Sequence, residues 1–200
     1  MGMKTMAVIM MVFVFPCLVL ANELQQGLFS QLTISENTAA SWVDFEVNSP
    51  DGKYVARIKA LSNQQAVPAY KKAYTLIVSK IADGNNQWFW QCNYDYDGYP
   101  SGMLANDGST FVYVSKYYNK KKPMVKIYRL GSKIALLYSS SFNISPANLK
   151  TDNNGKLWFD QDSLGCQFVY RARMPPLLEI TTIDKRKYYI SLDSGRILPN

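Results

Sequence analysis

Polar and apolar residues alternate with a period of two along most of this 200-residue chain. Such alternation is typical of strands that bury one face, because successive side chains of a strand point to opposite sides. Only residues 22–32 and 145–150 suggest a helix, the second no more than a single turn. The pattern therefore predicts an all-β fold with at most one short helix. The clearest alternating runs are residues 43–47, 53–60, 87–94, 166–173 and 188–192.

Turn-forming residues separate these runs. Asp-Gly and Asn-Gly pairs supply the positive φ angles that tight hairpins require. Strands joined by short turns pair antiparallel, so we expect antiparallel sheets. We also expect the four tryptophans, Trp42, Trp88, Trp90 and Trp158, to lie in the core, because aromatic side chains fill the space between sheets. The turn sequences lie at residues 49–52, 82–84, 106–108, 153–155 and 193–195.

A weak internal repeat places such a turn directly before a strand. Copies begin at Asp51 and Asp107, and a degenerate copy begins at Asn154, so the starts are 56 and 47 residues apart. These lengths are near that of a four-stranded propeller blade. Three units are too few for a closed ring of blades. We therefore expect an incomplete propeller or a stacked β-meander.

The sequence SPDGKYVA at residues 49–56 resembles the blade signature of TolB-like and WD-repeat-type β-propellers. Residues 104–137 and 178–198 are similar to secreted bacterial β-propeller-like proteins. The chain departs from the WD-repeat pattern because it has no Gly-His and no Trp-Asp dipeptide. The resemblance implies a binding or scaffold role at the bacterial envelope, and it implies no catalytic residues.

The first 21 residues have the features of a cleaved signal peptide. Lys4 precedes an apolar run that ends with the small residue Ala21, before polar residues. The run is shorter than the ~20 residues of a membrane-spanning helix, and Pro16 interrupts it. We expect residues 22–200 to form one all-β, propeller-like domain that is secreted or periplasmic. No second apolar stretch in it is long enough to span a bilayer.

The composition excludes several kinds of chemistry. The chain contains no histidine, which excludes a Ser-His-Asp triad and every His-ligated metal site. Residues 93–98 place oxygen ligands at alternating positions before a glycine, as calcium loops do. Leu104 stands where such a loop needs its bidentate acid, so we predict no metal site. We also predict no catalytic residues and no cofactor.

Two cysteines, Cys92 and Cys166, remain after removal of the signal peptide, and both lie on the apolar side of their predicted strands. In an oxidising compartment a disulfide between them would close a long loop and stabilise the fold by about 3–5 kcal/mol. Two separately buried thiols are the alternative. We predict the disulfide.

The formal net charge is +7, and the most basic segment runs from residue 116 to residue 133 without any acid. Such a segment attracts polyanions, and its tyrosines can stack on sugar rings or lie at a lipid headgroup layer. The alternative is a solvated segment whose lysines protect a sheet edge from aggregation. The predicted binding residues are Lys116, Tyr117, Tyr118, Lys120, Lys121, Lys122, Lys126, Arg129 and Lys133.

These observations predict an exported, non-enzymatic binding or scaffold protein. Its expected partner is an anionic envelope polymer, a lipid surface or an acidic protein, and nucleic acid is disfavoured outside the cell. One alternative is an envelope hydrolase that uses paired carboxylates, either Asp95 with Asp97 or Asp160 with Asp162. Another is a structural subunit that pairs with a partner through its sheet edges.

Overall fold

The computed structural model describes residues 33–34, 40–62, 64, 66–82, 84–160, 165–170 and 175–199. Within these residues strands predominate, and the helical segments are three short 3-10 turns: η1 (Ala69–Lys71), η2 (Ser139–Phe142) and η3 (Pro146–Asn148). The all-β prediction is thus confirmed, and η3 lies in the predicted turn at 145–150. The expected helix at 22–32 and the signal peptide lie outside the described residues. No helix in the described ranges is long and apolar enough to cross a bilayer.

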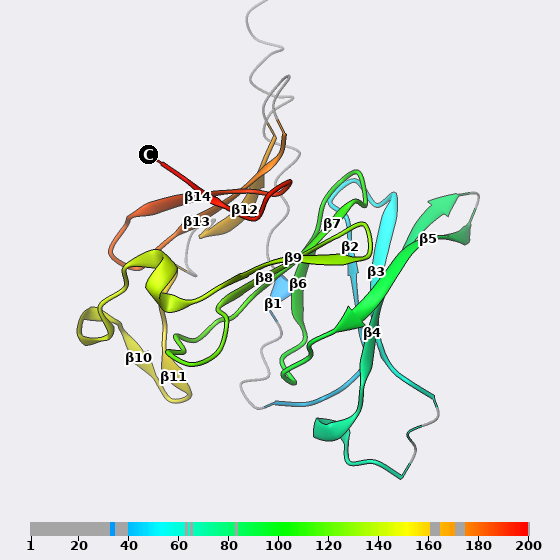
Figure 1. Cartoon of the computed structure of the whole chain (residues 1–200), viewed down its shortest axis with the longest axis horizontal. Coiled ribbons are helices and arrows are strands. Elements are labelled where there is room, and N and C mark those ends of the chain that lie inside the picture. Colours follow the sequence, from blue (N-terminus) through cyan, green and yellow to red (C-terminus); the bar gives the residue numbers. More distant parts are fainter. Residues whose placement is uncertain are drawn as a thin grey trace, which may run out of the picture.

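Three antiparallel meanders follow one another along the chain (Figure 1). The first sheet contains β2 (Phe45–Asn48), β3 (Tyr54–Ala60), β4 (Tyr74–Ala82) and β5 (Asn85–Tyr94). The middle sheet contains β6 (Ser101–Leu104), β7 (Thr110–Val114), β8 (Val125–Arg129) and β9 (Ser132–Leu137), with β1 (Thr33–Ile34) paired to the outer side of β6. The third sheet contains β12 (Cys166–Val169), β13 (Leu177–Thr181), β14 (Lys187–Ser191) and β15 (Ile197–Leu198). A hairpin of β10 (Thr151–Asp152) and β11 (Gly155–Lys156) lies between the second and third meanders in sequence.

The first two copies of the sequence repeat occupy equivalent places in the first and middle sheets. Each turn joins the first and second strands of its four-stranded meander, β2 to β3 in the first sheet and β6 to β7 in the middle sheet. A hydrogen bond connects the two turns, because the backbone N–H of Asp51 donates to Asn106 Oδ1 at 3.1 Å. The two turns therefore lie side by side at one end of adjacent sheets. The third copy differs, because Asn154 lies in the β10–β11 hairpin and does not begin a four-stranded unit.

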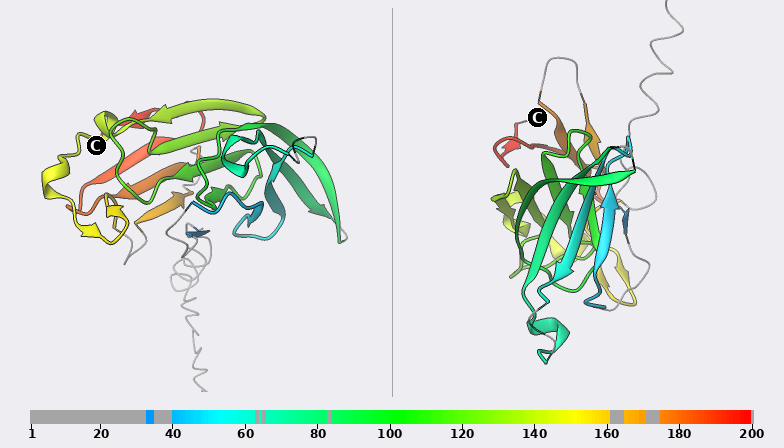
Figure 2. Two further views of the ribbon diagram at one scale, coloured as in Figure 1. Left: turned by 90° about the horizontal axis from the view of Figure 1, so that it is seen from below. Right: turned by 90° about the vertical axis from the view of Figure 1, so that its right-hand side faces the viewer.

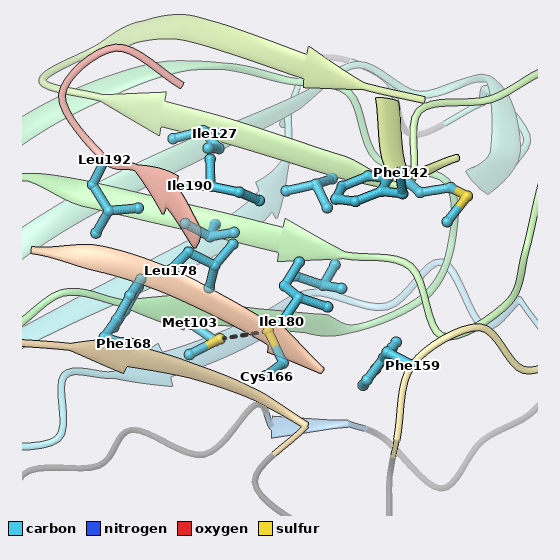
Figure 3. Close-up of a cluster of buried hydrophobic side chains, with 14 of the residues drawn as sticks. Met103, Ile127, Phe142, Phe159, Cys166, Phe168, Leu178, Ile180, Ile190 and Leu192 are labelled. Atoms are coloured by element: carbon cyan, nitrogen blue, oxygen red, sulfur yellow. Dashed lines mark hydrogen bonds between the residues drawn. The ribbon is translucent and has the colours of Figure 1, made fainter. Parts of the chain in front are cut away.

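The middle sheet is covered on both faces, which makes the fold a stack of three sheets (Figure 2). Between the first and middle sheets lies a first core that is rich in aromatic side chains. Between the middle and third sheets lies a second core that is mainly aliphatic (Figure 3). The first core includes Ile58, Leu76, Trp90, Tyr94, Phe111, Tyr113 and Tyr128. The second includes Met103, Val112, Ile127, Trp158, Phe168, Leu178 and Ile190.

Strand β7 shows why the middle sheet is apolar on both sides. Phe111 and Tyr113 point into the first core, whereas Val112 and Val114 point into the second, and all four are buried. A strand that is buried on both faces shows a continuous apolar run in place of alternation. Gly102 of β6 is needed beside this strand, because a Cβ atom there would lie 2.2 Å from the Phe111 ring.

The predicted disulfide between Cys92 and Cys166 is wrong, because the structure leaves both thiols free. Cys166 is buried in the second core, where its Sγ lies 3.6 Å from the sulfur of Met103 (Figure 3). Cys92 packs against the first core. The middle sheet separates the two cores, so the alternative of two separate thiols holds. Burial raises the pKa of Cys92 to about 11, which keeps this thiol protonated and poorly reactive at neutral pH.

The prediction that every tryptophan lies in the core is wrong for Trp88. Trp90 and Trp158 are buried and Trp42 packs against the first core, but the Trp88 side chain is 68% exposed. A register shift between β4 and β5, at Val78 and Ser79, displaces the regular alternation of β5 next to this residue. A β-bulge of this kind changes which side of the sheet the following side chains face.

Replacement of Phe111 with alanine tests the first core. Phe111 is completely buried, so Phe111→Ala should lower the free energy of unfolding by about 3–5 kcal/mol. The matched control is Phe89→Ala, because Phe89 is 38% exposed and its loss should cost about 1 kcal/mol or less. Urea unfolding of the two variants measures both values. Equal losses would contradict the burial of the middle sheet against the first.

Candidate functional site

The nine residues predicted to bind an anion do not form one surface. Six lie in the loop that joins β7 to β8, which we call the lysine–tyrosine loop: Lys116, Tyr117, Tyr118, Lys120, Lys121 and Lys122. The other three lie on β8 and β9. Each of those three cations contacts an acid that belongs to a different part of the chain.

Lys126 is the clearest departure from the predicted surface, because only 6% of its side chain is exposed. Its Nζ donates to the Asp95 carbonyl oxygen at 2.6 Å, lies 3.8 Å from Asp97 Oδ2 and sits 4.7 Å from the centroid of the Tyr113 ring. Burial lowers the pKa of Lys126, and the two aspartates partly oppose that shift. Lys126 is thus a structural cation inside the first core, not a binding residue on the surface.

Arg129 and Lys133 are also held by acids that the sequence pattern did not pair with them. Arg129 Nη2 lies 2.8 Å from Asp193 Oδ1 in the β14–β15 turn, which links the middle sheet to the third. Lys133 Nζ lies 2.6 Å from Asp95 Oδ2, which links the middle sheet to the end of β5. These partners are 64 and 38 residues away in sequence, so no local pattern could reveal them.

The lysine–tyrosine loop has a defined conformation. Asn119 Oδ1 accepts hydrogen bonds from the backbone N–H groups of Lys121 and Lys122, at 2.8 and 2.9 Å. The N–H of Tyr118 donates to the Lys156 carbonyl at 2.8 Å. The Tyr118 bond ties the loop to β11, and the Asn119 bonds define the turn at its tip, where three successive lysines, residues 120–122, are exposed to solvent.

The β10–β11 hairpin supports the first tyrosine of the loop. The Tyr117 hydroxyl donates to Asp152 Oδ2 at 3.1 Å, and the ring covers Gly155, where a Cβ atom would lie 2.9 Å from Tyr117 Cδ1. Trp158 Nε1 also donates to the carbonyl of Ser115, just before the loop, at 2.6 Å. Nothing in the local sequence pattern places this hairpin beside residues 115–118, so its part in the site could not be predicted from the sequence.

Two depressions flank the loop. One, of about 250 Å³, lies on the side of the β10–β11 hairpin and is lined by Asp97, Tyr99, Lys116, Tyr117, Lys122 and Asn154, among others. The other, of about 500 Å³, lies on the side of η2 and is lined by Tyr118, Lys120, Ser139, Ser140, Asn143, Ile144 and Pro146. The same short loop therefore presents cations and aromatic rings to two hollows.

The acids proposed for hydrolysis are engaged in other contacts. Asp95 contacts Lys133, and Asp97 Oδ2 accepts a hydrogen bond from the Tyr113 hydroxyl at 2.8 Å. Asp160 contacts Lys185, while Asp162 lies outside the described residues. In the part of the chain that the structure describes, no group of three or more acidic or cysteine side chains could hold a metal ion.

No protein-family model, curated protein or solved structure matches this chain. The resemblance to propeller proteins therefore stays a prediction that these comparisons do not test.

The buried tyrosines around Lys126 predict a loss of stability in alkaline solution. Burial raises the pKa values of Tyr94, Tyr113 and Tyr128 above that of an ordinary tyrosine, which is about 10. Their contribution to stability is present below pH 10 and is lost at higher pH, because the unfolded chain then releases protons that the folded chain retains. Lys126 has the opposite sign, since its folded pKa is lowered, but one lysine opposes three tyrosines. The free energy of unfolding should therefore fall above pH 10.

Urea unfolding across an alkaline pH series measures this effect, with Tyr113→Phe as the matched variant. The variant has one buried phenol fewer, so its stability should fall less steeply with pH. A free energy of unfolding that stays constant above pH 10 would contradict the burial of these hydroxyl groups.

Proposed function

We propose that this protein is an exported, non-enzymatic binding protein that engages an anionic surface or partner of the bacterial envelope through its lysine–tyrosine loop. The main support is the placement of four lysines in one ordered loop: Lys116, Lys120, Lys121 and Lys122. None of these four forms an ion pair within the described residues, whereas the remaining cations of the basic segment are all paired. The predicted signal peptide supports the extracytoplasmic location.

Edge protection does not account for these lysines. Lysine protects a sheet when it lies on an edge strand, where unpaired backbone groups would recruit another chain. The lysine–tyrosine loop joins β7 and β8, and both strands are paired on each side within the order β1-β6-β7-β8-β9. The cations of this loop therefore have no unpaired strand to protect, which favours a role in binding.

The order of the loop also favours binding. Asn119 and the contacts with the β10–β11 hairpin hold the lysines in place before any ligand arrives. A ligand then loses less free energy in ordering the protein. By contrast, the hydrolase hypothesis has no supporting observation, because Asp95 and Asp97 both contact lysine side chains of the core or its margin.

A second candidate function is pairing through the free edge of the first sheet. Strand β5 is an edge strand of ten residues without a charged side chain, and Trp88 and Phe89 are exposed on it. Long uncharged edges of this kind pair with other strands. Trp88→Lys should then convert an oligomer into a monomer in analytical ultracentrifugation. A wild-type protein that sediments as a monomer and recovers no crosslinked partner would rule this candidate out.

The proposed binding site is tested with the triple variant Lys120/Lys121/Lys122→Ala. Each lysine near an anionic surface contributes about 1 kcal/mol, so the variant should bind anionic vesicles or envelope fractions about 100-fold more weakly. Wild-type binding should also weaken as salt is added, because salt screens exposed charges. Co-sedimentation across a salt series measures both effects.

The matched control removes three exposed lysines from the first sheet and its loops, as Lys59/Lys71/Lys80→Ala. The two triple variants have the same net charge, so their difference isolates the place of the lysines from their number. Equal binding by both variants would contradict the proposal, as would wild-type protein that stays in the supernatant at low salt.

A further inference from the structure

The smaller hollow beside the lysine–tyrosine loop has features of a binding pocket. Three separate segments line it: residues 97–99, residues 115–123 and the tip of the β10–β11 hairpin. Its volume of about 250 Å³ is just below the range of pockets that hold drug-sized molecules, about 300–1,000 Å³. It therefore has room for one small ring or for one unit of a polymer.

Aromatic and amide groups form much of its wall. The Tyr117 ring is held by the hydrogen bond from its hydroxyl group to Asp152 and by its packing against Gly155. Tyr99, Asn119 and Asn154 also line the pocket. Flat aromatic faces pack against apolar ring faces, while amides donate to and accept from hydroxyl groups. This combination suits a polyhydroxylated ring better than an acyl chain.

The pocket contains both positive and negative side chains, and they lie at different depths. Lys116 and Lys122 provide two cations, and Lys122 is exposed. Asp97 lies deeper, with only 17% of its side chain exposed, and Lys126 Nζ, 3.8 Å from its Oδ2, offsets its charge. The charge of the deep carboxylate is therefore balanced within the protein, and Lys116 and Lys122 give the pocket its positive charge. The lysines can pair with an anionic group nearer to the opening.

We infer that this pocket binds one acidic sugar unit, with its hydroxyl groups toward the amides of the wall and its anionic group toward Lys116 and Lys122. This inference rests on the proposed function, because it names the class of anionic ligand that the lysine–tyrosine loop engages. The exposed Lys120 and Lys121 then contact further anionic units of the same chain. The ligand so defined is an acidic polysaccharide, and not a phospholipid surface or an acidic protein.

The inference is tested by NMR titration of the mature protein with a galacturonate trisaccharide. Maltotriose, a neutral trisaccharide, and inorganic phosphate are the comparison ligands. The acidic trisaccharide should shift the resonances of Tyr117 and Asn154 and bind at least tenfold more tightly than either comparison ligand. Phosphate that binds as tightly as the trisaccharide would overturn the inference, because phosphate has no sugar ring to contact the tyrosine and amide groups of the wall.

Two variants separate this inference from the proposed function. Lys122→Ala and Tyr117→Ala should each weaken trisaccharide binding about tenfold, which corresponds to 1.4 kcal/mol. Lys122 is exposed, so its replacement keeps the fold even if the loss of Tyr117 disturbs the loop. Lys59→Ala, which removes an exposed lysine of β3, is the control and should bind normally.

The two hypotheses then fail in different ways. Loss of envelope binding in the Lys120/Lys121/Lys122→Ala variant, together with no trisaccharide binding by the wild-type protein, would overturn the acidic-sugar inference and leave the proposed function in place. Anionic vesicles that bind wild-type protein while acidic saccharides do not would assign the loop to a lipid surface and overturn the inference as well. Envelope binding that persists in the triple variant would contradict the proposed function.

Discussion

Burial of the middle sheet on both of its faces is the constraint on which the rest of the structure depends. Phe111 and Tyr113 pack against the first sheet, and Val112 and Val114 pack against the third, so a single strand contributes to both cores. A four-stranded meander with one apolar face needs a second layer to cover it. Here the middle meander covers both of its neighbours. It also fixes the ends of β7 and β8, between which the lysine–tyrosine loop is held.

The same constraint decides which cations remain available. Lys126 lies on β8 under the first sheet, so its charge is satisfied within the core by Asp95 and Asp97. Arg129 and Lys133 lie near the margins of the stack, where Asp193 and Asp95 from other sheets reach them. The loop extends beyond the sheets and meets no acid that forms an ion pair within the described residues. Stacking of the sheets thus leaves the four lysines of this loop without an ion pair, whereas the other cations of the basic segment are paired.

The sequence predicted local structure well and contacts between sheets poorly. Alternation and Asp-Gly turns located most of the strands and the equivalent turns at Asp51 and Asp107, because both signals act within a few residues. The core assignment of Trp88 was wrong because a bulge interrupts the alternation of β5. The disulfide was wrong because an apolar position does not tell which of two cores a cysteine enters. The burial of Lys126 could not be predicted either, because the sequence does not tell which residues of the basic segment another sheet covers.

Hydrogen exchange of the native protein tests the central role of the middle sheet most directly. Amides of β7 and β8 are enclosed by both cores, so they should open only with global unfolding and should exchange more slowly than those of the first and third sheets. The slowest amides should therefore lie at residues 111–114 and 125–128. A middle sheet that exchanges earlier than its neighbours would contradict this account, because the outer sheets would then persist without the layer that is expected to hold them.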